Sequence, residues 1–251
     1  KSLKTVFNIK DISEKKCSDI YIIFGSKKVI DKYKLNSLFN ALNIKIINSL
    51  EKKNLKKGCI YFMDLFEIEH SLVTGKPDKQ NGQASYEYIK TAIKYALEKK
   101  IDSIVTAPIC KASLALAGIP YTGHTTMLSD LTNSPETSMA FYTEKLKTVL
   151  VTIHKPFKEV PKLLTEKNLS KAVENSFIFA KQLGLKNPRI AIAGLNPHAG
   201  EDGLFGTEEQ GQIIPVINKY IQKDQKVFGP FPADTIYHQA YNGEFDIVIS
   251  L

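Results

Sequence analysis

Short apolar segments alternate with longer segments of helical periodicity along this chain, and this alternation constrains the fold more than any other feature. Two segments, 84–100 and 170–183, carry apolar residues at spacings of three and four, which predicts amphipathic helices. Strands that alternate with helices predict an α/β fold, with a mostly parallel sheet between two helical layers. The strand-like segments are 21–24, 101–106, 148–153, 189–194 and 245–251.

Local signals predict how two of the helices begin and end. Gly184 follows the 170–183 helix and is its expected C-terminal cap, because glycine adopts the left-handed conformation at low cost. Thr207 and Gln210 have the spacing of a capping box and predict the start of a further helix. We expect Pro215 to kink that helix.

Polar side chains follow three of the predicted strands. His154 comes directly after the 148–153 strand, His198 lies in the segment after the 189–194 strand, and Lys111 follows the 101–106 strand closely. In open parallel sheets, ligands bind beyond the carboxyl ends of the strands. We therefore expect these three side chains at one rim of the sheet.

His154 and His198 are candidate metal ligands. Neutral imidazole is the commonest ligand for zinc and similar divalent ions. Two histidines at adjacent strand ends can bind one metal, with a third ligand and an open position completing a catalytic site. The alternative is that each is an ordinary surface or core residue. Another histidine, His124, lies in the polar loop 121–126 and has little reason to be buried there.

The segment 196–209 contains Gly200, Gly203 and Gly206 and leads into the helix predicted from Thr207. Glycines allow the backbone to approach a ligand, and a helix N-terminus favours an anion. The spacing matches neither the GxGxxG fingerprint nor the P-loop, so a plain surface turn is an equal alternative.

Lys111 and Asp234 each have a functional and an ordinary interpretation. Lys111 could pair with a phosphate or a carboxylate, or it could simply be solvated. Asp234 lies in the proline-rich segment 230–235, where capping a helix would be its ordinary role.

Composition excludes several classes of protein. The net charge is +8, but the lysines are spread along the chain, so we expect an anionic small substrate and no nucleic acid. No apolar run approaches the roughly 20 residues that span a bilayer. The first residues are too polar for a signal peptide.

The three cysteines lack metal-ligand spacing and predict free thiols in a reducing cytoplasm: Cys17, Cys59 and Cys110.

Four stretches of the chain have distinctive motifs: TAPICK at 106–111, AGIPYTGHT at 117–125, GLNPHAGE at 194–201 with GTEE at 206–209, and GPFPADT at 229–235. Together they resemble the 4-hydroxythreonine-4-phosphate dehydrogenase (PdxA) family of vitamin B6 synthesis. The third stretch is long and distinctive, and the resemblance covers most of the chain from about residue 70 onward.

The resemblance implies a fold similar to isocitrate and isopropylmalate dehydrogenases. Such a subunit has two interleaved α/β/α subdomains with a cleft, and it forms a homodimer with shared active sites. The implied reaction oxidises 4-phosphohydroxy-L-threonine with NAD or NADP, and the β-keto acid then decarboxylates to 3-amino-2-oxopropyl phosphate, in pyridoxal phosphate biosynthesis.

The resemblance also implies residue roles. A divalent metal, often zinc, with magnesium or cobalt as alternatives, would be held by His154, His198 and a third histidine. His124 and Thr125 match substrate-binding residues, and Lys111 and Asp234 match residues near the catalytic site. In the family the third histidine lies just after the strand that matches 245–251, so we expect the intact protein to continue beyond Leu251. An intact-mass measurement tests this expectation.

Three other functions are consistent with these motifs. The first is a paralogous dehydrogenase of another four-carbon phosphorylated hydroxy acid. The second is a non-catalytic module that keeps the fold. The third is a phosphate acyltransferase of related fold, which needs no metal, so the metal content distinguishes it from the dehydrogenase. His70 and His238 are expected to be surface residues without a role.

Overall fold

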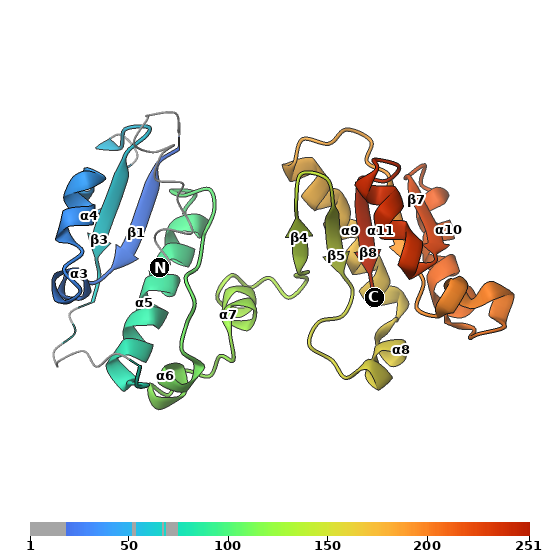
Figure 1. The fold of residues 1–251 in the computed structure, drawn as a ribbon, viewed down its shortest axis with the longest axis horizontal. Coiled ribbons are helices and arrows are strands. Elements are labelled where there is room, and N and C mark those ends of the chain that lie inside the picture. The colour runs from blue at the N-terminus through green and yellow to red at the C-terminus, as the bar shows by residue number, and fades with distance from the viewer. Residues whose placement is uncertain (1–18, 52–53, 67, 69–74) are drawn as a thin grey trace. The chain divides into compact units, whose positions relative to one another are not determined.

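The computed structural model describes residues 19–51, 54–66, 68 and 75–251. The chain divides into two compact units, residues 1–135 and 136–251, each built around a mostly parallel sheet (Figure 1). The mixed α/β architecture with parallel sheets confirms the predicted fold class. The predicted interleaving of two subdomains stays a prediction. Cys17 and His70 lie outside the described residues.

Alternate side chains of the buried strands in the second unit point into different hydrophobic layers. In β6 (Ile190–Ala193), Ile190 and Ile192 belong to one core cluster, whereas Ala191 and Ala193 belong to another. Successive side chains of a strand point to opposite faces of the sheet, so this sheet is buried on both faces.

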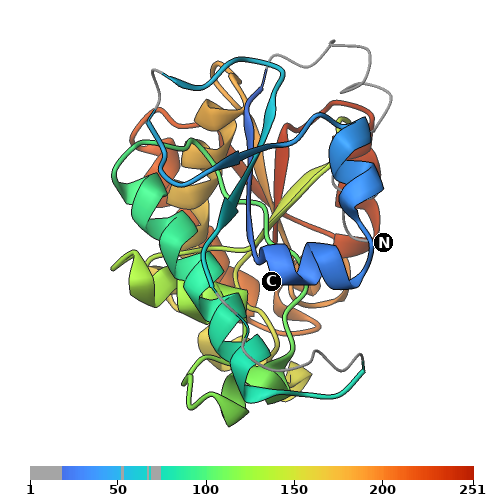
Figure 2. The same cartoon turned by 90° about the vertical axis from the view of Figure 1, so that its left-hand side faces the viewer.

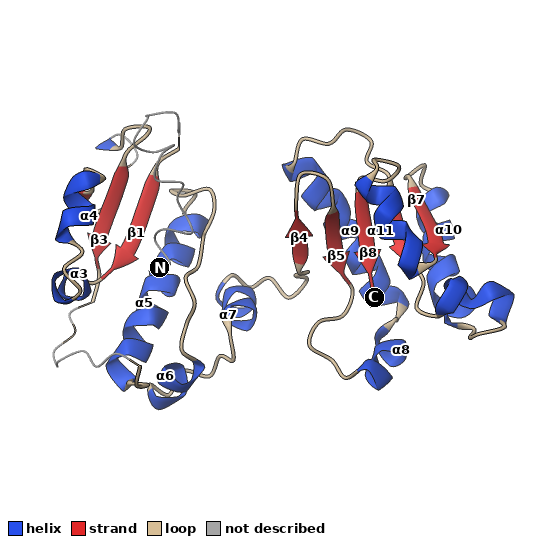
Figure 3. Ribbon diagram, in the orientation of Figure 1, coloured by secondary structure: helices blue, strands red, loops and turns tan. Residues whose placement is uncertain are grey.

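The second unit contains a five-stranded sheet in the order β4-β5-β8-β6-β7. β4 pairs antiparallel with β5, and the remaining pairs are parallel. Core residues of α9 and α10 cover one face of the sheet, and those of α11 cover the other (Figure 3). The elements are β4 (Ala140–Tyr142), β5 (Lys147–Leu150), η2 (Phe157–Glu159), α8 (Val160–Leu163), α9 (Glu166–Gln182), β6, η3 (Pro197–Gly203), η4 (Glu209–Ile213), α10 (Ile214–Ile221), β7 (Val227–Phe231), α11 (Ala233–Tyr241) and β8 (Ile247–Ser250).

The first unit contains a three-stranded parallel sheet in the order β1-β3-β2. Ile30 of α3 and Phe39 of α4 pack with Phe62 of β3, whereas Phe24 of β1 stacks on Tyr95 of α5. α3 and α4 lie on one side of this sheet and α5 lies on the other (Figures 1 and 2). The elements are β1 (Tyr21–Gly25), α3 (Lys27–Lys32), α4 (Asn36–Ala41), β2 (Lys45–Ile47), β3 (Ile60–Asp64), α5 (Lys79–Leu97), α6 (Lys111–Leu116) and α7 (His124–Leu131).

The strand predicted at 101–106 is wrong, because these residues form a loop between α5 and α6. Ile104 and Ile109 pack against a cluster formed by α5, α6 and α7, while Val105 is 72% exposed. An apolar run of this length predicts burial but does not distinguish a strand from a loop that packs on helices.

The two predicted long helices are confirmed. α5 starts five residues earlier than expected, because the side chain of Asp78 caps it by accepting a hydrogen bond from Asn81 N at 3.0 Å. α9 ends in a Schellman motif at Gly184, whose φ is 74°. There Leu185 N donates to the Ala180 carbonyl at 3.0 Å, as the glycine signal predicts.

The helix predicted from Thr207 begins irregularly. A π turn, η4, precedes α10, and its start carries no side-chain cap of the kind that a capping box would provide. Pro215 lies in the first turn of α10. Proline lacks an N–H and its ring clashes with the preceding turn, which is consistent with the wide turn directly before it. The predicted kink stays a prediction.

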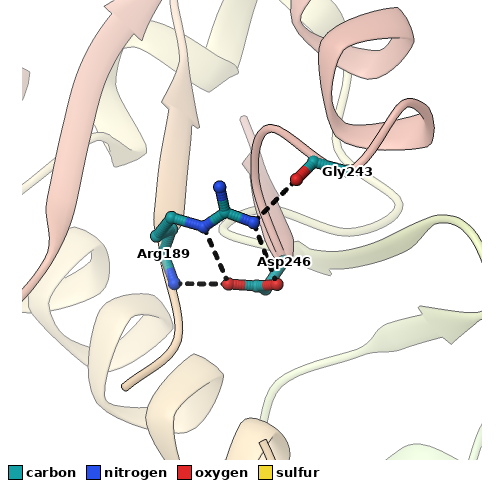
Figure 4. Close-up of polar contacts among 3 residues, drawn as sticks. All are labelled: Arg189, Gly243 and Asp246. Atoms are coloured by element: carbon teal, nitrogen blue, oxygen red, sulfur yellow. Dashed lines mark hydrogen bonds and ion pairs between the residues drawn. The ribbon is translucent and has the colours of Figure 1, made fainter. Parts of the chain in front are cut away.

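Arg189 joins the starts of β6 and β8 (Figure 4). Its Nη2 donates to the carbonyl of Gly243 at 2.7 Å and its Nε donates to Asp246 Oδ2 at 3.3 Å. The same Oδ2 accepts from the backbone N of Arg189 at 2.7 Å. Two neighbouring parallel strands are thereby held in register at their amino ends.

Candidate functional site

The carboxyl edge of the parallel strands in the second unit carries three of the predicted site residues. β5, β8, β6 and β7 are parallel, so their carboxyl ends lie along one edge of the sheet. His154 follows β5, His198 follows β6, and Asp234 follows β7. The edge therefore combines two imidazoles and one carboxylate at the position where α/β sheets bind ligands.

The strands that carry the two histidines are not adjacent. β8 lies between β5 and β6 in the sheet, which corrects the expectation of neighbouring strand ends. Strands lie about 4.8 Å apart, so the axes of β5 and β6 are roughly 10 Å apart. The carboxyl end of β8, at Ser250, lies between them.

The backbone around both histidines is left-handed. His154 has a φ of 53° and is exposed. His198 begins a run of five residues, 198–202, whose φ values lie between 39° and 82°, and only Gly200 among them is glycine. A left-handed conformation costs each non-glycine residue about 1–2 kcal/mol. Contacts outside the run must therefore hold it in place.

Glu209 holds the backbone directly before this run. Its side chain is buried, with the residue 2% exposed, and its Oε1 accepts hydrogen bonds from the backbone N of Leu195 and of Asn196, both at 2.8 Å. Its Oε2 accepts from Asn196 Nδ2 at 2.9 Å. Burial raises the pKa of Glu209, but the hydrogen bonds from Asn196 and Leu195 outweigh burial and leave this pKa below its ordinary value.

Glu209 is a residue that sequence reasoning missed. It is part of the GTEE stretch, but a glutamate at the start of a helix is usually solvated, and no periodicity marks this one as buried. One sequence feature could have indicated that Glu209 is buried: it comes after a glycine-rich segment that itself follows a buried strand. A carboxylate is one of the few groups that can accept several backbone N–H bonds there.

Asp234 lies in the first turn of α11 and is exposed. The N-cap of this helix is Pro232, so Asp234 does not take the capping role that was the alternative interpretation. A carboxylate in the first turn is favoured by the helix dipole. Asp234 thus remains available to a ligand at the sheet edge.

The first unit carries the other predicted site residues at two helix starts. Lys111 is the first residue of α6 and is exposed. His124 and Thr125 begin α7; Thr125 is exposed, and the Nε2 atom of His124 is buried without a hydrogen-bond partner. The strand expected to lead to Lys111 is not formed. The prediction that Lys111 lies at the same sheet edge as His154 and His198 is therefore wrong in its premise, and the strand ends that carry site residues all belong to the second unit.

Within the described residues, no group of three or more histidine, cysteine or acidic side chains is arranged to hold a metal. A cavity of about 190 Å³ lies between the start of α9 and the π turn, and its lining contains none of the predicted site residues. In the part of the chain that the structure describes, no helix has the length and apolar character that crossing a membrane requires.

Cys59 and Cys110 are free thiols, as predicted. Hydrogen bonds from Ser113, together with one from the backbone of Ala112, lower the pKa of the exposed Cys110 thiol. His238 is exposed on α11 next to Asn242, which agrees with its expected surface position.

Comparisons with known proteins agree with the fold and the motifs. A family model described as pyridoxal phosphate biosynthetic protein PdxA matches residues 15–251. A protein named 4-hydroxythreonine-4-phosphate dehydrogenase, from Sulfurihydrogenibium sp., is 37% identical over 232 residues, which are 92% of this chain and 70% of that protein.

A D-threonate 4-phosphate dehydrogenase from Salmonella typhimurium is 34% identical over 232 residues, which are 92% of this chain and 71% of that protein. Among solved structures, a 4-hydroxythreonine-4-phosphate dehydrogenase from Burkholderia phymatum superposes with a TM-score of 0.82 at 32% identity, covering 96% of this chain and 74% of that one. The chain thus spans 70 to 74% of the length of these three relatives.

Proposed function

Because the chain belongs to the PdxA family of pyridoxal phosphate biosynthetic proteins, we propose that it is a dehydrogenase of 4-phosphohydroxy-L-threonine. In the proposed reaction, the hydroxyl carbon of the substrate loses a hydride to NAD or NADP and the hydroxyl oxygen loses a proton. The resulting β-keto acid releases carbon dioxide and takes up a proton, which gives 3-amino-2-oxopropyl phosphate.

The observation that carries the proposal is the carboxyl edge of the second sheet. His154, His198 and Asp234 come from three different strand ends, and all three are exposed on one edge. Two imidazoles and a carboxylate thus lie where α/β folds bind their ligands.

The donor set at this edge fits a divalent metal. Imidazole nitrogen binds Zn²⁺ at about 2.0–2.1 Å, and two histidines fill two of the three protein positions of a catalytic zinc site. Side chains from strands roughly 10 Å apart can converge above the strand between them. When bound, such a metal would polarise the substrate hydroxyl and lower its pKa, and magnesium or cobalt could serve in place of zinc.

The residues of the first unit would bind and orient the substrate. A buried imidazole nitrogen without a partner is costly, so the Nε2 of His124 fits a residue that gains its hydrogen bond from a ligand. Thr125 offers a hydroxyl beside it. The ammonium of Lys111, exposed at a helix start, suits the phosphate or carboxylate of the substrate. Asp234 would accept or hold a proton near the reacting carbon.

The test is formation of reduced nicotinamide from 4-phosphohydroxythreonine, with and without a chelator. We expect turnover that a chelator abolishes and that Zn²⁺, Mg²⁺ or Co²⁺ restores. His154→Ala and His198→Ala should each lower kcat/KM by about 100-fold or more. His238→Ala, which removes an exposed histidine of the same unit, should leave kcat/KM unchanged. Chelator-resistant turnover would exclude the metal role.

A second candidate substrate is D-threonate 4-phosphate, because relatives with that name match the chain at similar identity. The two substrates differ at the carbon next to the carboxylate, which carries an ammonium in one and a hydroxyl in the other. Comparing kcat/KM for both substrates decides between them, and a higher value for the threonate would overturn the first proposal.

We also propose a cytoplasmic homodimer with shared active sites, as the family resemblance implies. Light scattering measures the assembly state. His154 and His198 lie in the same chain, so the assembly state under assay conditions is the deciding measurement. A chain that is active as a monomer would overturn the shared sites.

A further inference from the structure

The loop between β6 and η4 carries His198 in a conformation that its own sequence does not favour. Residues 198–202 are left-handed, and four of the five have side chains that disfavour this region. His198 itself is exposed, and its only described ring contact is with Phe205, at 6.0 Å between centroids. Its position must therefore be fixed through the backbone that leads to it.

Glu209 fixes that backbone directly before the histidine. Its carboxylate holds the N–H groups of Leu195 and Asn196 and the side-chain amide of Asn196. Only Pro197 separates Asn196 from His198, and proline has a fixed φ. Where Glu209 holds Asn196 therefore limits where the backbone of His198 can lie.

The glycines of the loop make room for this arrangement. A Cβ atom on Gly200 would lie 2.7 Å from Glu209 Oε2, and one on Gly206 would lie 2.3 Å from Asn196 Nδ2. A Cβ on Gly194 would lie 2.8 Å from the Cα of Ala199. Gly200 and Gly206 thus make room for the buried carboxylate and for the amide of Asn196. The close approach of this loop to a ligand, expected from the sequence, stays a prediction.

Glu209 is also poorly placed to act as a ligand itself. An ionised carboxylate has about four acceptor sites, and those on Glu209 are occupied by the backbone N–H groups of Leu195 and Asn196, the side-chain amide of Asn196 and the backbone N–H of Glu209 itself. Its neighbour Glu208 differs, because it is half-buried and contacts the same amide of Asn196 at 2.8 Å without holding a backbone N–H. The two glutamates therefore form a natural comparison.

We propose that Glu209 is the positioning residue for His198, acting through Asn196 and Pro197. This inference rests on the proposed role of His198 as a metal ligand. Removing the carboxylate should release the loop without changing the ligand atoms, and Zn²⁺ affinity should fall although both histidines are still present.

The experiment compares the full chain with Glu209→Ala, Glu209→Gln and Glu208→Gln. Hydrogen exchange of peptides from residues 195–206 reports the order of the loop, and calorimetric titration with Zn²⁺ reports the metal site. For Glu209→Ala we expect faster exchange in this loop, unchanged exchange in β6 and β8, and a loss of Zn²⁺ affinity of about 10-fold or more. Glu209→Gln keeps one oxygen acceptor and should show a smaller loss, while Glu208→Gln should match the unmodified chain.

The outcomes separate this inference from the proposed function. Unchanged loop exchange and Zn²⁺ affinity in Glu209→Ala would overturn the positioning role and leave the metal site standing. If the unmodified chain binds no Zn²⁺, the metal proposal fails, and the loop exchange still decides whether Glu209 holds the loop. If exchange rises equally throughout the second unit, even in Glu209→Gln, the role is one of general stability and the inference is wrong.

Discussion

Arg189 is the only arginine in the chain, and its contacts use more than one nitrogen of the guanidinium. Its guanidinium bonds the Gly243 carbonyl and the Asp246 carboxylate at the same time. A lysine has the same charge but a single nitrogen at its end, so it cannot span both acceptors. This difference is a physical reason for an arginine at this position.

We expect Arg189→Lys to lower the free energy of unfolding by about 1–2 kcal/mol, the cost of a lost hydrogen bond to a partly buried group. Urea unfolding followed by circular dichroism measures this change. The control is Lys219→Met, which removes an exposed ion pair with Glu166 at 2.7 Å and should cost less than about 1 kcal/mol. Equal effects of the two changes would contradict the account of Arg189.

Glu209 should make the stability of the protein sensitive to acid. Its pKa in the folded state lies below the ordinary value of 4.5, so folding favours the ionised form. Its contribution is complete above that ordinary value and is lost as the pH falls through the lowered folded-state pKa. The unmodified chain should therefore lose stability more steeply than Glu209→Gln below pH 4.5. Unfolding curves at a series of pH values test this, and parallel curves would refute it.

At the scale of elements, the contact between α5 and α6 depends on one glycine. A Cβ atom on Gly82 would lie 2.0 Å from the carbonyl oxygen of Ser113, which is a backbone atom that cannot rotate away. The two helices are further tied by a hydrogen bond from Asp78 N to Ser113 Oγ at 3.1 Å. Gly82 is therefore required for the close approach of the helices, despite its poor helix propensity.

We expect Gly82→Ala to destabilise the first unit by about 3 kcal/mol, because α6 must move away and the packing of Leu114 is lost. Thermal unfolding measures the effect. Gln83→Ala, one residue further along the same helix, should change stability by less than about 0.5 kcal/mol. A neutral or stabilising Gly82→Ala would mean that the helices do not approach so closely.

At the scale of the whole molecule, each unit has hydrophobic clusters of its own. The core of the second unit is drawn from strands and helices within residues 136–251, and both faces of its sheet are covered. A unit that buries its own core can fold without the rest of the chain.

We therefore expect a fragment of residues 136–251 to fold alone, with a cooperative unfolding transition and a dispersed amide NMR spectrum. If the fragment is folded, its Glu209→Ala variant should keep the dispersion of β6 and β8 signals. A fragment that lacks a cooperative transition would show that the second unit needs the first.

Local signals in the sequence determined the two long helices and several strands. α5 and α9 follow from their apolar spacing, and the end of α9 follows from Gly184, because these patterns act between residues that are close along the chain. The buried strands β6 and β8 follow from short apolar runs. The motifs around His124, His198 and Asp234 were sufficient for the family, which the comparisons confirm.

Tertiary structure alone decided the strand order and the buried carboxylate. The sequence does not show that β8 lies between β5 and β6 in the sheet, because strand order depends on pairing between segments far apart in the chain. The wrong strand prediction at 101–106 has the same cause. The apolar residue Ile104 of this segment packs against helices of the first unit, and the sequence does not show which elements will cover it. Glu209 is buried only because a loop 13–14 residues earlier delivers two backbone N–H groups to it, and that encounter exists only in the folded chain.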